Sequence, residues 1–268
     1  MSDAREPSFA GSFYPGDMQS LNTMIDGFFR RAKSEKIRNI RGLIVPHAGY
    51  IYSGKIAASG YRNLLESGEA ARPIILLGPN HRGFPYDPVT DSALEWKFPN
   101  GNLSLNRSLI ASVDKENVKT DHYAHALEHS LEVQGPIIVR KVPNFGILPI
   151  IIGDQSFSSI LRLYKDLSEI LPDTVIIATS DLSHYIPEKT ARKIDEKIIS
   201  SIETLDIKAL YSLVDSGATP CGYGPAAFLM LYSAENGFKL EHVSYGTSAD
   251  TTGDSESVVG YTAIVCHG

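Results

Sequence analysis

The stretch GLIVPHAGYIYSGKIAASGYRNLL, residues 42–65, combines a short apolar run, a turn that carries a histidine, and a long amphipathic run. We predict a strand over Leu43–Pro46 and a helix over Gly54–Leu65. The strand is apolar almost throughout, as is typical of strands buried on both faces of a sheet. The stretch therefore indicates an α/β fold.

The rest of the chain repeats this alternation of short β-rich runs with longer amphipathic runs. The other predicted strands are Ile74–Gly78, Ile147–Ile152, Val175–Thr179, His242–Tyr245 and Val258–Val265. The other predicted helices are Asp17–Arg31, Leu103–Val113, Glu128–Lys141, Phe157–Ile170, Glu188–Glu203, Asp206–Ser212 and Gly224–Glu235. Ser156 and Asp206 are the expected N-caps. No internal repeat or long linker divides the chain, so we predict one domain over residues 1–268.

The composition is that of an ordinary globular protein, with 43% hydrophobic and 21% charged residues. No apolar run approaches the roughly 20 residues of a membrane-spanning helix, and the opening MSDAREPSFAGSFYP lacks the features of a signal peptide. A net charge of −6 gives no basic footprint for nucleic acid, and Arg30, Arg31 and Lys33 read as a solvated helix face. Two cysteines exclude a disulfide framework. We expect a cytoplasmic protein that binds neither membranes nor nucleic acid.

Residues of the types that bind metals or take part in catalysis follow several of the predicted strands. The segments are PHAGY at 46–50, PNHRG at 79–83, SDLSHY at 180–185 and, after a helix, CGYGP at 221–225. In open α/β sheets, binding sites form beyond the carboxyl ends of the strands, where loops from several strands meet. The sequence therefore predicts one shared pocket built from segments that lie far apart in the chain.

His47 and His81 each follow a predicted buried strand. A lone histidine in such a place is more often a hydrogen-bonded structural residue, but two at equivalent strand ends favour metal ligation. Cys221 lies between a proline and two glycines. Its thiolate could be a third metal ligand or a nucleophile. The structural alternative is a small buried side chain with no chemical role. Cys266, in an apolar strand, reads as structural.

Asp181 and His184 are three residues apart, just beyond a predicted strand. A carboxylate beside an imidazole orients the ring and raises its basicity, which suits a general acid or base. The alternative is a helix N-cap followed by a surface histidine. A serine hydrolase is disfavoured because neither Ser180 nor Ser183 lies in a G-x-S-x-G turn.

The densest cluster of candidate ligands is DHYAHALEHSLEVQ, residues 121–134. If this stretch is helical throughout, His122, His125 and His129 share a face, as do Glu128 and Glu132. They could then form a second metal site, or His129 and Glu132 could support the pocket from the helix N-terminus. An H-E-x-x-H motif is absent. Neither a G-x-G-x-x-G turn after a strand nor a Walker sequence occurs, so no nucleotide cofactor is expected.

Seven segments in order resemble the Memo-like protein family. They are REPSFAGSFYPGD, GLIVPHAGYIYSGKIAA, LLGPNHRG, AHALEHSLEVQ, ATSDLSHY, ATPCGYGP and TSADTTGDSESVVGY, and they run nearly from end to end. The resemblance implies the fold of the class III extradiol, non-haem iron dioxygenases. In that fold a central, mixed and mostly parallel sheet is flanked by helices.

The resemblance also implies roles for particular residues. It places a metal at His47, His81 and Cys221, and it assigns His184, with Asp181 beside it, the position of the dioxygenases' acid/base histidine. The dioxygenases have a carboxylate where this chain has Cys221, so their ring-cleaving activity is not expected of this protein. We expect His129, Glu132, His125 and Tyr52 to support or line the pocket.

The function expected from the resemblance is a redox-active metal site for iron or copper, with zinc as an alternative ion. Family members are associated with copper-dependent redox activity, with iron, and with phosphorylated peptides. Microbial forms look like partners of radical-SAM and AMMECR-type proteins. Two rival functions stay open: a binding module that kept the pocket but not catalysis, and a metal-independent thiol enzyme with Cys221 as nucleophile.

Overall fold

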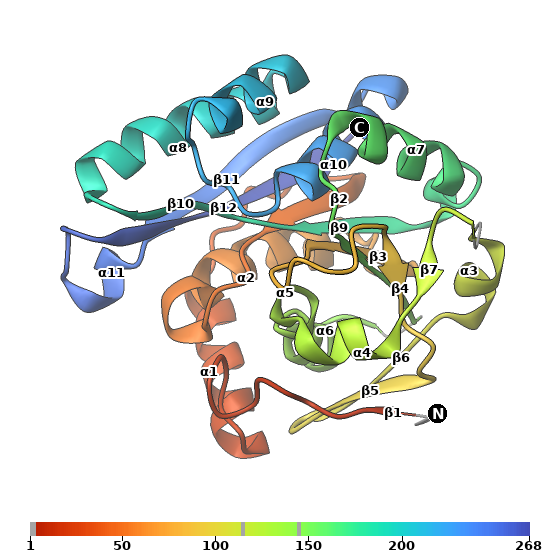
Figure 1. Cartoon of the computed structure of the whole chain (residues 1–268). Helices are drawn as coiled ribbons and strands as arrows, with labels where there is room; N and C mark the ends of the chain where they lie inside the picture. The colour runs from red at the N-terminus through yellow and green to blue at the C-terminus, as the bar shows by residue number, and fades with distance from the viewer. Residues whose placement is uncertain (1–3, 114–115, 144–145) are drawn as a thin grey trace.

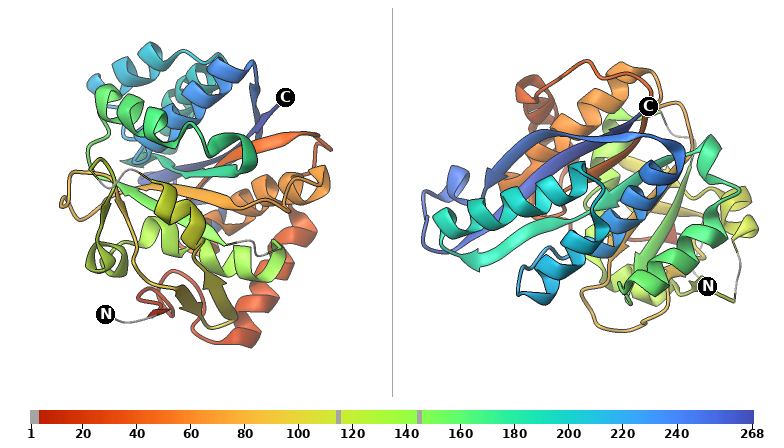
Figure 2. Two further views of the ribbon diagram at one scale, coloured as in Figure 1. Left: turned by 90° about the vertical axis from the view of Figure 1, so that its right-hand side faces the viewer. Right: turned by 90° about the horizontal axis from the view of Figure 1, so that it is seen from above.

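The computed structural model describes residues 4–113, 116–143 and 146–268. Its centre is a mixed sheet with helices on both faces (Figures 1 and 2). The four central strands are parallel and lie in the order β2 (Ile40–Val45), β9 (Val175–Thr179), β3 (Ile74–Pro79) and β8 (Ile147–Ile152). Each is buried along nearly its whole length, in agreement with the apolar runs in the sequence.

Antiparallel strands extend the sheet beyond β2. The long strand β12 (Val258–His267) pairs with β2 through its C-terminal part and with β10 (Asp181–Ile186) through its N-terminal part. Its other edge pairs with β11 (Lys239–Thr247). At the far side, β4 (Val89–Thr90) runs antiparallel to β8 and parallel to β7 (Lys119–Thr120).

Helices cover the two faces of the sheet as separate layers. One face carries α1 (Met18–Arg31), α2 (Tyr50–Ser67), α5 (His129–Glu132) and α6 (Gly135–Lys141). The other carries α7 (Phe157–Leu167), α8 (Glu188–Glu203), α9 (Ile207–Asp215) and α10 (Tyr223–Asn236). The shorter elements are α3 (Arg107–Ser112), α4 (His122–Leu127), α11 (Ala249–Thr252) and a 3-10 turn over Leu171–Asp173. Within the described residues, every helix is too short or too polar to cross a membrane.

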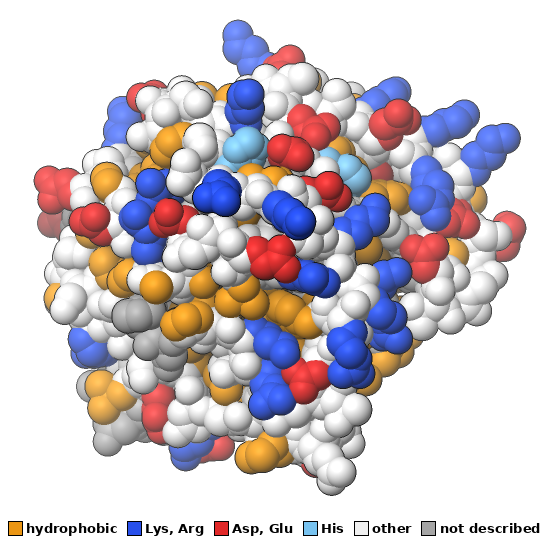
Figure 3. All heavy atoms as spheres, turned by 180° about the vertical axis from the view of Figure 1, so that it is seen from behind, with side chains coloured by type: hydrophobic (Ala, Val, Ile, Leu, Met, Phe, Trp, Pro, Cys, Tyr) orange, Lys and Arg blue, Asp and Glu red, His pale blue; other side chains and the backbone are white. Residues whose placement is uncertain are grey.

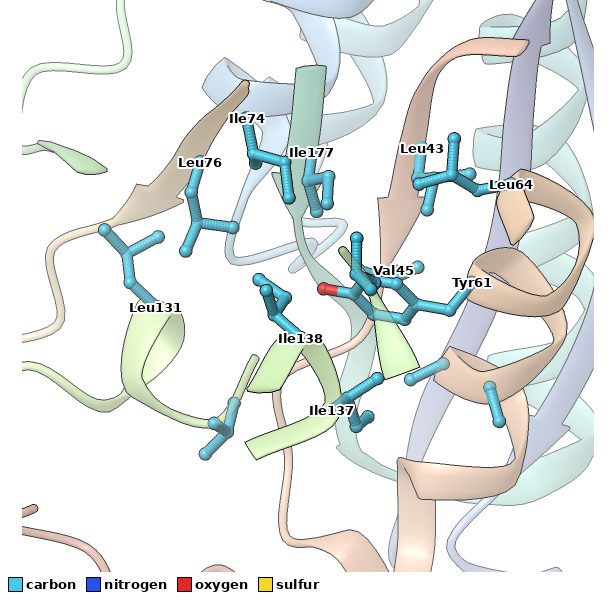
Figure 4. Close-up of a cluster of buried hydrophobic side chains, with 14 of the residues drawn as sticks. Leu43, Val45, Tyr61, Leu64, Ile74, Leu76, Leu131, Ile137, Ile138 and Ile177 are labelled. Atoms are coloured by element: carbon cyan, nitrogen blue, oxygen red, sulfur yellow. The ribbon is translucent and has the colours of Figure 1, made fainter. Parts of the chain in front are cut away.

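Alternate residues of the central strands supply the two cores. Leu43 and Val45 of β2 point to the layer of α1, α2 and α6, whereas Ile44 between them points to the layer of α7 to α10. Figure 4 shows the first core, in which Tyr61 of α2 and Ile137 of α6 meet the sheet. The predicted α/β class and the flanked mixed sheet are confirmed.

A small second sheet lies beyond the first helical layer and was not predicted. It consists of β1 (Ala4–Arg5), β5 (Glu95–Phe98) and β6 (Gly101–Ser104). Its strands are too short to show a clear periodicity in the sequence. It bears on the candidate site because it anchors the N-terminal segment of the described chain, which reaches the pocket at Phe13.

Several predicted helices differ from the observed ones in their bounds. The helix expected over Gly54–Leu65, for example, spans Tyr50–Ser67. Two of the differences have a clear local cause. The helix expected over Leu103–Val113 begins only at Arg107, because the Asn106 side chain accepts a hydrogen bond from the amide of Leu109 and caps the helix there. The helix expected over Glu128–Lys141 is divided into α5 and α6. Pro136 has no amide hydrogen and stands in the first turn of α6, a position that favours the start of a new helix over the continuation of an old one.

Gly135 gives a direct test of the packing at this division. A Cβ at position 135 would lie 1.9 Å from Cζ of the buried Phe98 ring. We expect Gly135→Ala to lower the free energy of unfolding in urea by about 1–3 kcal/mol, since overpacking exceeds the helix-propensity gain of up to ~1 kcal/mol. Gly27→Ala in α1 is the control, because its Cβ would meet nothing closer than 3.7 Å. Equal stabilities for the two variants would contradict this packing.

Candidate metal centre

A cavity of about 570 Å³ opens at the carboxyl ends of the central strands. Four histidines from four segments line it: His47, His81, His129 and His184. Its walls also carry aromatic and acidic side chains, namely Phe13, Tyr52, Tyr185, Tyr261, Asp181 and Asp254. Among the described lining residues there is no lysine or arginine. Segments that are far apart in the sequence therefore come together at one edge of the sheet, as predicted.

His47 is fixed by contacts from β9 and β10. It follows β2 after Pro46, and its amide donates a hydrogen bond of 2.9 Å to Oδ1 of Asp181. Its Nδ1 lies 3.0 Å from Oγ1 of Thr179, so Nε2 is the ring nitrogen left for a ligand. Burial, together with His81 and the other nearby imidazoles, holds the pKa of His47 well below its ordinary value. The ring is thus neutral, the form that ligates a metal.

His81 is held by Glu128 from the turn before α5. One carboxylate oxygen accepts the His81 amide at 2.7 Å, and the other lies 2.9 Å from its Nδ1. Burial tends to raise the pKa of Glu128, but its interactions with His81 and His129 outweigh this and lower it to about 2. The ionised carboxylate accepts a hydrogen bond from Nδ1–H and leaves Nε2 with its lone pair, the arrangement found around metal-bound histidines.

Cys221 approaches His47 from the turn before α10. Its Sγ lies 3.0 Å from Nε2 of His47 and accepts a hydrogen bond of 3.2 Å from the Asp181 amide. Burial, with a further contribution from Asp181, raises the pKa of the thiol well above its ordinary value. A high pKa disfavours a free thiolate nucleophile, whereas a bound cation deprotonates a coordinating thiol.

These three residues form a donor set that fits a transition metal. His47, His81 and Cys221 each offer one donor atom, and these three atoms lie within 4.8 Å of one another. Because Nδ1 of each histidine is engaged elsewhere, Nε2 is the nitrogen available to a metal. His81, Glu128 and His129 form a second such group that shares His81. In the second group, Glu128 is already engaged by the His81 amide and ring and by the Ser130 amide, so it is better suited to support His81 than to bind an ion.

His129 lies beside the donor set. Its ring centroid is 4.5 Å from that of His81 and 5.5 Å from that of His47. Burial lowers its pKa to about 4, against the opposing effect of Glu128. Phe13 packs on its ring at a centroid separation of 4.7 Å. His129 therefore belongs to the pocket as expected, as a neutral imidazole at the wall.

His184 lines the cavity, but Asp181 does not orient its ring. Nδ1 of His184 lies 2.8 Å from the carbonyl oxygen of Leu182 and 2.9 Å from that of Thr219. Carbonyl oxygens only accept, so Nδ1 carries the proton and Nε2 is free to exchange one. Asp181 instead accepts from the His47 amide, and burial raises its pKa to about 6. The expected carboxylate–imidazole pair is thus replaced by contacts with backbone carbonyl oxygens, and Asp181–Ile186 forms strand β10.

The remaining predicted residues divide between pocket and core. Tyr52 lines the cavity near its mouth. Glu132 does not line it; it is fully buried and binds Arg5 and the N-terminal segment. His125 is also buried away from the cavity, with Nε2 3.1 Å from the carbonyl oxygen of Val89. Both were expected beside the pocket from their spacing to His129, which is four residues after His125 and three before Glu132. Extended backbone at Glu128 separates His125 in α4 from α5, and Glu132 is held by Arg5.

Two supporting residues were not assigned their roles from the sequence. Glu128 was grouped with Glu132 by helical spacing, but it stands in extended backbone between α4 and α5, and its carboxylate contacts His81. Thr179, at the end of β9, was read only as part of a strand. A polar residue at the carboxyl end of a buried strand, next to SDLSH, is the signal that could have indicated Thr179.

Fold and site together define an α/β protein whose histidine-rich pocket, at the ends of parallel strands, carries a His–His–Cys donor set. The profile of the family described as "Memo-like protein" matches residues 5–265. Three similar proteins, each called a MEMO1 family protein, come from Archaeoglobus fulgidus, Methanosarcina acetivorans and Aquifex aeolicus. Their identities are 35%, 36% and 38%, over 97–98% of this chain and 98–99% of theirs. The chain belongs to the Memo-like protein family.

Proposed function

We propose that this protein binds iron or copper, or alternatively zinc, through His47, His81 and Cys221. The supporting observation is the convergence of three donor atoms from three distant segments, with Nδ1 of each histidine engaged elsewhere. Two imidazoles and a thiolate are a softer set than two imidazoles and a carboxylate, and they suit copper and zinc as well as iron. The closeness to dioxygenases implied by the sequence is therefore not a reason to expect ring cleavage.

The proposed activity is a metal-dependent oxidoreduction of a ligand bound in the cavity. Iron or copper bound at the donor set would supply redox chemistry and Lewis acidity there. His184, with its proton fixed on Nδ1, would accept a proton from the ligand at Nε2 and return it. Phe13, His129 and Tyr52 would bind the ligand's apolar part and limit the access of water. The free thiols of Cys221 and Cys266 suit a reducing compartment, and we propose the cytoplasm.

Metal analysis of anaerobically purified protein tests this proposal. We expect close to one iron or copper per chain, and loss of most of it in His47→Ala/His81→Ala and in Cys221→Ser. His267→Ala is the matched control, because His267 pairs with Glu241 at the far end of β12. Wild-type protein that takes up no iron, copper or zinc, or Cys221→Ser protein with unchanged metal content, would contradict it.

A second candidate function is a binding module that takes a peptide or protein partner at the same pocket. It is favoured by two exposed aromatic side chains at the pocket, Tyr185 at 77% and Tyr52 at 37% exposure. Radical-SAM and AMMECR-type proteins are the partners that the family resemblance suggests. An interaction that persists in EDTA and in Cys221→Ser would favour this function over the metal-dependent one.

A further inference from the structure

Cations from three separate segments meet in a hollow away from the metal pocket. Its lining consists of Asp26, Phe29 and Arg30 from α1, Arg62 from α2, and Arg140 and Lys141 from α6, and its volume is about 550 Å³. We call it the basic hollow. Figure 3 shows Lys and Arg side chains gathered on the lower right of the back face, the side that α1 occupies after the turn from Figure 1.

Several cations of the basic hollow keep unused hydrogen-bond donors. Asp26 binds both Arg140, at 2.8 Å, and Lys141, at 2.5 Å, so one carboxylate is shared by two cations. Lys141 also lies over the ring of Phe29, 5.0 Å from its centroid. Arg30 is exposed and has no ion-pair partner among the described residues. The lining thus carries four positive charges and one negative charge.

The backbone holds part of this charge in place. Arg62 donates from Nη1 to the carbonyl oxygens of Phe29 and Ala32 and from Nε to Glu66. Its guanidinium is therefore positioned before any ligand arrives, which lowers the entropy lost on binding. Hydrogen bonds from Arg140 and Lys141 lower the pKa of Asp26 to about 2, so Asp26 stays ionised and paired with both cations.

We propose that the basic hollow is a docking site for an acidic segment of a partner protein. An exposed ion pair contributes only about 0–1 kcal/mol, so a single small anion would gain little from this open site. A segment with several carboxylates engages several cations at once, and its contacts add. A nucleic acid would extend past the hollow over a chain of net charge −6 and be repelled.

The basic hollow is separate from the candidate metal centre, although α2 contributes to both. Tyr52 near the start of α2 lines the metal pocket, and Arg62 lies ten residues further along it. Ten helical residues span about 15 Å. The proposed docking therefore does not depend on a bound metal, and a partner seated at Arg62 would lie within reach of the pocket's mouth.

A fluorescein-labelled deca-glutamate peptide, titrated into the full chain at about 20 mM salt, tests the proposal by fluorescence anisotropy. We expect saturable binding that Arg30→Glu weakens about tenfold or more, because a like charge then faces the peptide. Lys208→Glu is the control with the same change in net charge; Lys208 is exposed on α9, on the other side of the sheet. It should stay within about twofold of wild type. Asp26→Asn should tighten binding, because it removes the one negative charge of the lining.

Four results would overturn the assignment. The first is absence of peptide binding, and the second is an equal loss of affinity in Arg30→Glu and Lys208→Glu. Another is a deca-thymidylate that binds more tightly than the peptide and is lost in Arg30→Glu, which would make the hollow a nucleic-acid site. The fourth is self-association in light scattering that Arg30→Glu abolishes, which would make a second copy of this chain the occupant.

Discussion

Glu132→Ala is expected to lower the free energy of unfolding by about 3–5 kcal/mol, because it leaves the buried Arg5 guanidinium without its counter-charge. Nη2 of Arg5 lies 2.6 Å from Oε2 of Glu132, and both side chains are inaccessible to solvent. The same carboxylate accepts hydrogen bonds from the amides of Ser8 and Phe9 and from the Tyr14 hydroxyl. For a chain of this length, the expected drop in Tm is on the order of 10 °C.

A double-mutant cycle separates the ion pair from the other bonds of Glu132. If the unpaired charge dominates, Arg5→Met/Glu132→Leu should be more stable than Glu132→Ala, since apolar residues of similar size often replace a buried ion pair at little cost. Glu6→Ala is the control, because Glu6 is exposed and pairs with Lys97, which is also exposed. It should change the free energy of unfolding by less than about 1 kcal/mol. In urea unfolding, the loss of stability in Arg5→Met/Glu132→Leu is compared with the sum of the losses in Arg5→Met and Glu132→Leu. If the two are equal, the pair is not coupled.

The role of Glu132 shows why the fold could be predicted from the sequence but the candidate site only in part. The central strands could be predicted because each is a nearly continuous apolar run, and His47 and His81 could be placed because each follows such a run. Glu132 was misplaced because its position depends on a salt bridge to Arg5, 127 positions earlier, and on hydrogen bonds from the N-terminal segment. Periodicity within a window carries no information about such partners.

The contacts of His184 were unpredictable for a related reason. Spacing placed Asp181 next to His184, and both line the cavity, but the Asp181 carboxylate accepts a hydrogen bond from the His47 amide. Register shifts between β10 and β12 flank His184, and its Nδ1 lies near backbone carbonyl oxygens. Backbone acceptors leave no signature in the sequence. The basic hollow could not be predicted either. The sequence groups Arg30 with Arg31 and Lys33, whereas Arg140 and Lys141 reach the hollow only because α6 packs against α1.

Glu128→Gln is expected to weaken metal binding about 10- to 100-fold while the donor set of His47, His81 and Cys221 stays intact. The carboxylate of Glu128 fixes the proton of His81 on Nδ1, at 2.9 Å, and also holds the His81 amide. Glutamine can keep only one of these acceptor contacts, and it removes the negative charge that makes the imidazole a better donor. Because the pKa of Glu128 is about 2, wild-type Glu128 stays ionised at every pH suited to metal titration.

Competition between the protein and a chromophoric chelator for Co²⁺ or Zn²⁺ measures this effect, and the thiolate absorption of the cobalt form reports whether Cys221 still binds. Glu241→Gln is a matched control, because Glu241 also pairs with a histidine, His267, but outside the pocket. We expect its affinity to equal that of wild type. A Glu128→Gln protein with wild-type affinity would mean that Glu128 only fixes the turn at residues 80–83. A loss of affinity with unchanged thiolate absorption at saturation would instead show that Glu128 acts on the ion through His81, since the cysteine ligand would then be retained.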